Sequence, residues 1–305
     1  QRNELVDSED VGGTIRNMVG ADGGVAGNGV YLSSTNNVSL SWMQLNDFQN
    51  FAIRGVGVTG FTLANSVISG TNGNSAAADE GSISFSGLTG SASVTSTNIS
   101  GGLEDNFRLV NTSGTLNRIT FSSVTIGLNS TTDGNDGILL EAQTGATVNV
   151  TVQNSTFTSA RGDLFQLNHI GTAPCDLVFT GNTLTNNHPA IATGGGGVTI
   201  GGSGTGNLTY VISGNSFRDS DGHAVLLVKS TSAASYTGSF SSNSIGVAGV
   251  ADSGPKAGSG LRVQNAGGGE MRISATKNQI RQYNNFGIEL LTGGSASPQG
   301  GQLNA

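Results

Sequence analysis

Short runs of alternating apolar and polar residues recur in a fixed order between residues 134 and 291. One repeat reads Ile-Leu-Leu at 138–140, Val-Asn-Val-Thr-Val at 148–152 and Asn-Ser-Thr-Phe at 154–157. The corresponding runs of later repeats lie at 165–167, 177–179 and 182–184, at 224–228, 236–240 and 243–245, and at 261–263, 271–275 and 278–280. Because each run is short and is bounded by Gly, Asn or Asp, the pattern predicts three β-strands per repeat and no helices.

Two sets of positions measure the length of the repeat. The first apolar position recurs at intervals of 24 to 36 residues, at Ile83, Phe107, Ile138, Phe165, Ile191, Val225, Leu261 and Ile288. The third run of each repeat carries a recurring Asn, at Asn65, Asn98, Asn154, Asn182, Asn215, Asn243 and Asn278, with Ser123 in the place of a missing Asn. Both sets indicate one repeat of variable length that extends over most of the chain.

Repeats of this kind bury their apolar positions only by stacking. A stacked arrangement pairs every strand in parallel with its copy in the next coil, about 4.8 Å away. The sequence therefore predicts an all-β fold, a single parallel β-helix of roughly ten coils with three short strands per coil. We expect residues 28–305 to form this β-helix, as a fragment of a longer chain, and residues 1–27 to form an irregular first coil or cap.

The recurring Asn has a structural explanation. Asn adopts the left-handed backbone conformation of a tight turn more readily than most residues with a side chain, and Asn amides in successive coils can bond to one another. The glycine runs at 194–197 and 267–269 are interpreted as turn extensions, since no Gly-Lys-Ser/Thr sequence follows them.

The repeated phrases, Gly-apolar-x-apolar followed by apolar-x-apolar and Asn-Ser-apolar, resemble those of the right-handed parallel β-helix (pectin-lyase-like) superfamily. Within it, residues 28–291 are more similar to the repeat regions of large bacterial surface proteins and autotransporter passengers than to the pectinases. The resemblance implies a right-handed coil, as does the usual hand of parallel crossovers.

Composition and charge exclude several classes of partner. A formal net charge of −7 and a pI near 4.8 give no electrostatic basis for binding nucleic acid or an anionic membrane. No stretch approaches the roughly 20 apolar residues of a membrane span, so we expect no direct membrane insertion. The single cysteine, Cys175, excludes an intramolecular disulfide. Since 14 of the 20 acidic residues lie within 1–163, cation binding is expected in the first half of the chain.

Acidic residues precede the first strand of successive repeats. Asp105, Asp136 and Asp163 each stand two residues before the first apolar position, and Asp79 and Glu80 lie one coil earlier. Carboxylates repeated at the coil spacing repel one another unless they are protonated, paired with arginine or bound to Ca²⁺. These five residues are candidate Ca²⁺ ligands, the one metal cofactor considered. The alternative is solvated aspartates in turns, and the chain lacks a Gly-Gly-x-Gly-x-Asp calcium repeat.

A second candidate site is the group Asp219, Asp221 and His223, which places two carboxylates and an imidazole within five residues. The resemblance implies a catalytic interpretation, because pectin-degrading hydrolases use paired Asp and a Gly-His-Gly to protonate the leaving oxygen and activate water. Here the sequence at 222–224 matches that motif only in part, and the paired Asp of neighbouring coils is absent. The alternative is a turn with a surface histidine.

A third candidate is a basic group that falls within one repeat and could bind an anionic polysaccharide. It consists of Arg262, Arg272, Lys277 and Arg281. Lyase chemistry would need such a base beside Ca²⁺-binding acids, but the acidic series lies several coils away. The scarcity of Trp and Tyr disfavours a long glycan cleft. An ice- or mineral-binding face would need flat threonine ladders, and the threonines hold no single register along the sequence.

Taken together, these patterns favour a non-enzymatic, extended segment of an exported bacterial surface protein, with a stalk, matrix or adhesin role. The expected location is secreted or at the cell surface, associated with the outer membrane. The expected partners are a host or neighbouring-cell surface, a polysaccharide, and adjacent segments of the same parent protein. The alternative is a carbohydrate-active enzyme, either a polysaccharide lyase or a glycoside hydrolase, of the pectin-lyase-like class.

Overall fold

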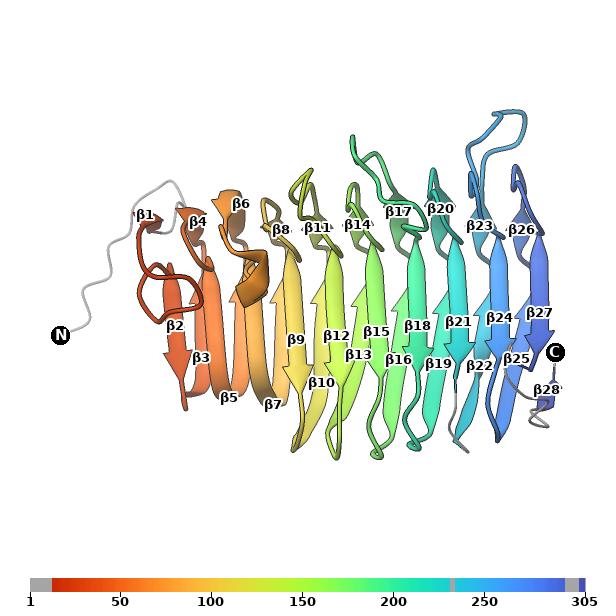
Figure 1. Ribbon diagram of the computed structural model, residues 1–305, viewed down its shortest axis with the longest axis horizontal. Coiled ribbons are helices and arrows are strands. Elements are labelled where there is room, and N and C mark those ends of the chain that lie inside the picture. The colour runs from red at the N-terminus through yellow and green to blue at the C-terminus, as the bar shows by residue number, and fades with distance from the viewer. Residues whose placement is uncertain (1–12, 231–233, 294–301, 305) are drawn as a thin grey trace.

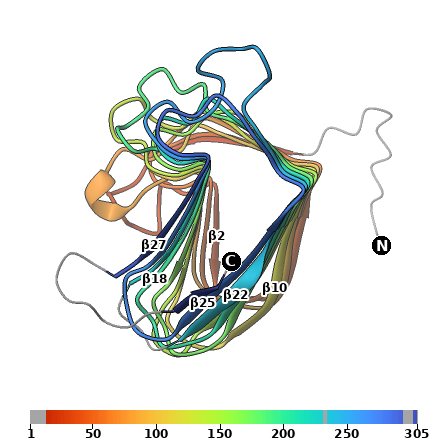
Figure 2. The ribbon, with the colours of Figure 1, turned by 90° about the vertical axis from the view of Figure 1, so that its right-hand side faces the viewer.

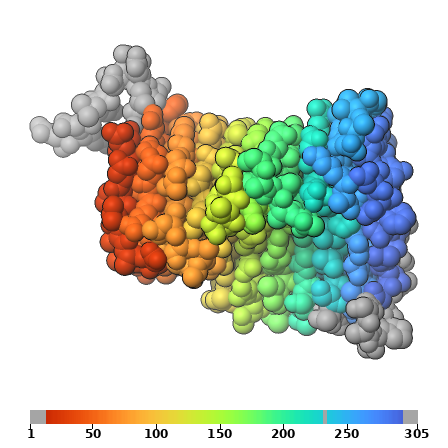
Figure 3. Space-filling model, turned by 45° about the horizontal axis from the view of Figure 1, so that its top comes forward, coloured from red at the N-terminus to blue at the C-terminus, as the bar shows by residue number. Residues whose placement is uncertain are grey.

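The protein is a rod of stacked coils. A computed structural model describes residues 13–230, 234–293 and 302–304. It is all-β, with 52% strand and 1% helix, and its strands form a parallel β-solenoid of about nine turns. Figure 1 shows the coils succeeding one another from the N-terminal to the C-terminal end, and in Figure 3 the colours form bands across the molecule, so each coil contacts its sequence neighbours. The predicted fold class is confirmed.

Three walls enclose the interior when the rod is viewed along its axis (Figure 2). Within each coil the chain passes along face 1, then face 2, then face 3. Face 1 contains β2 (Val30–Ser33), the first part of β5 (Ile53–Ala64) and of β7 (Ile83–Thr95), β9 (Phe107–Asn111), β12 (Ile138–Ala142), β15 (Phe165–His169), β18 (Val198–Gly202), β21 (Val225–Lys229), β24 (Leu261–Asn265) and β27 (Ile288–Thr292).

Face 2 contains β3 (Asn36–Ser41), the second part of β5 and of β7, β10 (Thr115–Ser122), β13 (Thr147–Gln153), β16 (Cys175–Thr180), β19 (Leu208–Ser213), β22 (Ser235–Ser241), β25 (Glu270–Thr276) and β28 (Gln302–Asn304). Because β5 and β7 run unbroken around the corner, faces 1 and 2 join into one sheet of 18 strands.

Face 3 is a separate sheet of ten shorter strands. It contains β1 (Thr14–Met18), β4 (Gln44–Phe48), β6 (Val67–Asn72), β8 (Asn98–Ile99), β11 (Thr125–Ile126), β14 (Thr156–Phe157), β17 (Thr183–Thr185), β20 (Ser216–Arg218), β23 (Ser244–Ile245) and β26 (Gln279–Ile280). Loops of variable length lead from face 3 back to face 1, and one of them contains the short helix η1 (Ala76–Ala78). All the strand pairs are parallel, as predicted, and three strands per coil is the general pattern.

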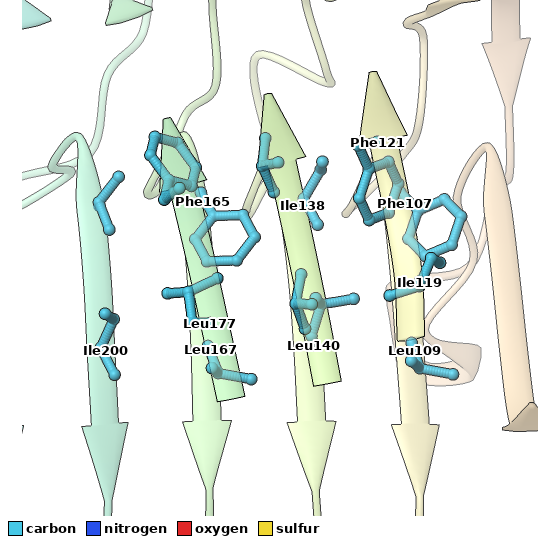
Figure 4. Close-up of a cluster of buried hydrophobic side chains, with 14 of the residues drawn as sticks. Phe107, Leu109, Ile119, Phe121, Ile138, Leu140, Phe165, Leu167, Leu177 and Ile200 are labelled. Carbon is cyan, nitrogen blue, oxygen red and sulfur yellow. The ribbon is translucent and has the colours of Figure 1, made fainter. Parts of the chain in front are cut away.

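Alternating burial along the strands creates the interior. β13, for example, alternates between partly exposed and buried residues from end to end. The inward side chains of faces 1 and 2 meet in the interior (Figure 4), where Phe107 and Phe121 lie edge to face with ring centroids 4.9 Å apart. Phe165 packs against Phe179 at 5.2 Å. These four phenylalanines therefore lie in the core, as the alternating apolar pattern predicted.

Two sequence expectations need comment. Residues 14–18, within the segment expected to be an irregular first coil or cap, form β1, which pairs in parallel with β4; residues 1–12 lie outside the described residues. Ile191 was expected to be the first inward position of its coil, but it lies in the loop before face 1, and Val198 of β18 takes that place. The loop before face 1 is long in this coil, so counting from the preceding repeats placed the first inward position too early.

The turn between faces 2 and 3 contains two columns of residues that the sequence merged into one. The first column has positive φ and includes Asn65, Ser123 and Asn154, whose φ values are 50°, 56° and 50°. The second column follows it by one residue and is buried. Its later members are Asn182, Asn215, Asn243 and Asn278, each bonded through Nδ2 to Oδ1 of the next at 3.0 Å. Both explanations for the recurring Asn are confirmed, but for different residues. Asn98 fits neither, because it is the exposed first residue of β8 and lies beyond both columns.

Candidate functional site

The three aspartates of the predicted acidic series form one column at the entrance to face 1. Each Oδ1 accepts a hydrogen bond from the backbone N–H at the same position one coil further on. Asp136 donates to Asp105 at 2.8 Å, Asp163 donates to Asp136 at 2.8 Å, and Gly196 donates to Asp163 at 2.6 Å. Asp105 and Asp136 are each only 2% exposed. These carboxylates join consecutive coils, and they are not solvated turn residues.

Burial dominates the electrostatics of this column. Desolvation raises the pKa of Asp105 to about 7, against the lowering effects of the Asp136 N–H and the nearby Arg108. Desolvation likewise raises the pKa of Asp136 and of Asp163. Asp105 Oδ2 has no hydrogen-bond partner among the described residues. With its amide nitrogen turned toward the column, Gln166 donates to Asp136 Oδ2 at 3.1 Å and to Asp163 Oδ2 at 3.2 Å. Burial therefore disfavours the ionised form of all three carboxyls, and repulsion from neighbouring acidic side chains adds to this at Asp105 and Asp136.

Asp79 and Glu80, the other two predicted Ca²⁺ ligands, have separate roles. Glu80 is fully buried and accepts hydrogen bonds from the backbone N–H groups of Gly23 (2.7 Å), Asn74 (2.8 Å) and Ser75 (2.9 Å), so it joins two loops. The Asp79 carboxylate lies on the surface, 2.5 Å from Arg108 Nη1. Across the described part of the chain, no group of three or more His, Cys, Asp or Glu side chains is placed to hold a metal ion.

His223 belongs to the same column as the aspartates. It stands two residues before Val225 of β21, and its Nδ1 accepts a hydrogen bond from the Ser259 N–H at 2.9 Å. This bond requires an unprotonated Nδ1. Burial lowers the pKa of His223 and nearby Arg262 lowers it further, which favours the neutral ring. The histidine therefore performs the same coil-to-coil task as Asp105, with a different acceptor atom.

The two aspartates near His223 do not complete a catalytic group with it. Asp221 Oδ2 accepts a hydrogen bond from the Gly194 N–H at 3.2 Å, toward the preceding coil. Asp219 occupies a left-handed turn position with φ of 58°, and its N–H bonds to Ser253. Neither carboxylate makes a recorded hydrogen bond to the His223 ring within the described residues.

The predicted basic group is dispersed around the rod. Arg262 lies on face 1, 3.6 Å from Glu289, whereas Arg272 lies on face 2 and pairs with Glu270 at 2.7 Å. Lys277 occupies the turn between faces 2 and 3 with φ of 59°, and Arg281 follows β26 on face 3. These four residues share one coil but point from different walls, so they do not form a single surface for a polysaccharide chain.

Sequence reasoning missed a cleft on face 1, beneath the loop that contains η1. The cleft has a volume of about 280 Å³ and is lined in part by Arg54, Asp79, Ser84 and Arg108. Glu104 lies next to Asp79, and burial raises the pKa of Glu104 to about 7, as does the neighbouring Asp79. The missed signal is positional: Arg54, Ser84 and Arg108 pair in register across β5, β7 and β9. Without the register, their sequence separations of 30 and 24 residues give no hint of contact.

Comparisons with known proteins add no identification: no protein-family model, no curated protein and no solved structure matches the chain. Within the described residues, no helix is long and apolar enough to cross a membrane.

Proposed function

We propose that this chain is a non-enzymatic, extended segment of an exported bacterial surface protein, with a stalk, matrix or adhesin role. One observation carries the proposal: the aspartate column and the histidine that suggested chemistry are engaged between coils. Asp105, Asp136 and His223 each hold a backbone N–H of the next coil. The hydrogen bond occupies Nδ1 of His223. Among the described residues, the buried acids do not belong to any group of three or more side chains placed to bind a metal ion.

The proposal extends to location and partners. The Gly- and Asn-rich repeat, with one cysteine in 305 residues, supports export to the cell surface, associated with the outer membrane. The likeness to autotransporter passengers and to the right-handed, pectin-lyase-like superfamily belongs to the same proposal. At the last coil, Ile288 and Leu290 are 47% and 42% exposed, whereas the equivalent Leu261 and Val263 are fully buried. Adjacent segments of the parent protein are the proposed partners, because such a segment would cover these exposed apolar side chains.

A polysaccharide screen tests the non-enzymatic proposal. Purified protein incubated with acidic and neutral polysaccharides, with and without Ca²⁺, is expected to release no reducing ends or unsaturated products. Reproducible depolymerisation that disappears in His223→Ala, with the melting temperature of the variant measured alongside, would contradict the proposal and assign catalysis to the loop that holds Asp219, Asp221 and His223.

The face 1 cleft favours one second candidate, a carbohydrate-active enzyme of the pectin-lyase-like class. Its supporting observation is the pair Glu104 and Asp79, where a carboxyl with a pKa of about 7 adjoins a carboxylate paired with Arg108. Acid–base cleavage of a glycosidic bond uses two carboxyl groups with different proton affinities, held roughly 5 to 9.5 Å apart. Glu104 and Asp79 are hydrogen-bonded to each other, so a bound sugar would have to separate them. Activity in the same screen that is lost in Glu104→Gln but retained in His223→Ala would support this candidate.

A further inference from the structure

Two columns of hydroxyl side chains run along the outside of face 2, next to the turn into face 3. The first column, in coil order, is Ser39, Thr62, Ser93, Thr120, Thr151, Val178, Val211, Ser239 and Ser274. The second, two residues further along each strand, is Ser41, Ala64, Thr95, Ser122, Gln153, Thr180, Ser213, Ser241 and Thr276. We call these two columns the hydroxyl face.

The register of the hydroxyl face is unbroken. Each residue pairs directly with the next one in its column, and the irregularities of β5, β7 and β10 lie outside both columns. All its members are partly or fully exposed, while the residue between the two columns points inward in every coil. The sequence expectation that threonines hold no single register stands, because they are divided between the two columns. The columns become regular only when serine and threonine are counted together.

The array is regular in two directions. Parallel strands place equivalent hydroxyls about 4.8 Å apart across the coils, and two residues along a strand span roughly 6.6 Å. Nine positions in each column extend over roughly 40 Å. Val178 and Val211 in the first column, and Ala64 and Gln153 in the second, interrupt the hydroxyls; the two valines keep the branched shape of threonine. Ser93 Oγ donates to Thr62 Oγ1 at 3.4 Å, so neighbouring coils align their side chains as well as their backbones.

No member of the hydroxyl face is itself charged, although the Arg118 guanidinium of the adjoining column donates a hydrogen bond to Thr151 Oγ1 of the face at 2.9 Å. Charges begin in the adjoining outward column, where Arg118 Nη2 lies 2.6 Å from Asp176 and Arg272 Nε lies 2.7 Å from Glu270. On the other side of the hydroxyl face, each second-column residue is followed by a turn residue with positive φ. Of these turn residues, Lys277 is the charged one. Strands exposed to water commonly carry Lys, Glu or Arg outward, so a continuous uncharged strip on a chain of net charge −7 is a specific feature.

The chemistry of the hydroxyl face selects among partners. An anionic polysaccharide needs cationic side chains, and a neutral polysaccharide favours exposed aromatic side chains. Protein interfaces favour aromatic residues, Met and Arg. The two columns of the hydroxyl face contain no residue of these types. A hydroxyl is both donor and acceptor, as a water molecule is. Ice presents only donors and acceptors at fixed spacings and no charge. A preformed array of hydroxyls and methyl groups can meet such a lattice without ordering its own side chains at the moment of binding.

We propose that the hydroxyl face is an ice-binding surface, in which the two in-register columns of Ser and Thr side chains contact the ordered water of an ice crystal. This goes beyond the structural role of the rod and does not depend on export. It predicts that the protein is incorporated into growing ice, lowers the freezing point below the melting point, and slows recrystallisation.

Two lysine substitutions on one strand form a matched test. Ser93 and Ser86 both lie on β7, but Ser93 is in the hydroxyl face and Ser86 is outward on face 1. The full chain, its Ser93→Lys variant and its Ser86→Lys variant are compared for thermal hysteresis and for uptake into a growing ice hemisphere. Thr120→Lys, at the middle of the first column, gives a second variant, and thermal melting checks that each one folds.

The wild-type protein and Ser86→Lys are expected to give equal hysteresis and uptake, and Ser93→Lys and Thr120→Lys to fall to the level of an inert control protein. Exclusion of the wild-type protein from ice would overturn the proposal, as would an equal loss in Ser86→Lys. Binding to crystalline cellulose or chitin without any effect on ice would also overturn it and assign the hydroxyl face to a polysaccharide.

Discussion

At the residue scale, one backbone position explains the aspartate series and the histidine among the side chains that suggested a functional site. A side chain at the position two residues before a strand of face 1 can accept the N–H of the next coil, although Phe51, Gly81 and Gly196 occupy this position without an acceptor. Asn28, Asp105, Asp136, Asp163 and His223 all provide one. The three aspartates were visible as a series in the sequence because they share a residue type. His223 was not, because the requirement is for an acceptor atom and not for a particular side chain.

The raised pKa of Asp105 predicts a dependence of stability on pH. A carboxyl whose pKa is about 7 when folded and near its ordinary 3.8 when unfolded contributes full stability at acidic pH, and loses that contribution as the pH rises through 7. The melting temperature should therefore fall between pH 5 and pH 8, and Asp105→Asn should melt higher than the wild-type protein at pH 8 and depend less on pH.

The control is Asp252→Asn, which changes an exposed loop carboxylate. It is expected to follow the wild-type profile. The prediction is contradicted if the melting temperature of the wild-type protein rises from pH 5 to pH 8 and Asp105→Asn follows the same profile. That result would mean that ionising the buried column does not lower the free energy of unfolding.

At the element scale, the turn between faces 2 and 3 works in two parts. A left-handed residue reverses the chain, and the residue after it points inward to cap the coil. In the first half the inward acceptors are hydroxyls, as where Ser66 Oγ accepts from the Met43 N–H at 3.0 Å. From Asn182 onward they are Asn amides. The sequence predicted Asn for both reasons but could not separate the columns, because they differ by one residue while the repeat length varies by several.

Removing one amide from the buried Asn ladder should destabilise the protein. Asn215 Nδ2 donates to the Phe179 carbonyl and to Asn243 Oδ1, both at 3.0 Å, and its Oδ1 accepts from the Asn182 N–H at 2.9 Å. Asn215→Ala leaves these buried groups without partners, at a cost of about 3 kcal/mol in the free energy of unfolding.

Urea denaturation measures this cost, with Asn149→Ala as the matched control. Asn149 lies on the outside of face 2 and donates one hydrogen bond to Asn117. A change within about 0.5 kcal/mol is expected there. Equal effects of the two substitutions would mean that the ladder contributes nothing beyond an ordinary surface amide.

At the scale of the whole molecule, the sequence predicted what repeats and missed what depends on register. Alternating apolar runs predicted the parallel coils and the inward phenylalanines, because burial requires them wherever the coil lengths fall. Loops between faces 3 and 1 vary in length, so counting along the chain misplaced Ile191. The same variation hid the hydroxyl face and the alignment of Arg54 with Arg108, since strands that pair directly are separated by different numbers of residues. The basic residues looked like one group for another reason: they are close in sequence, but they lie on different walls of the same coil.

The central claim is that polar side chains which resemble catalytic groups hold one coil to the next, and amide hydrogen exchange tests it most directly. In the wild-type protein, the Ser259 N–H, which bonds to His223 Nδ1, should exchange slowly. In His223→Ala, exchange at Ser259 should accelerate, while the Asp163 N–H, held by Asp136 elsewhere in the same column, should remain protected. Fast exchange at Ser259 in the wild-type protein, or exchange there that His223→Ala leaves unchanged, would contradict the claim.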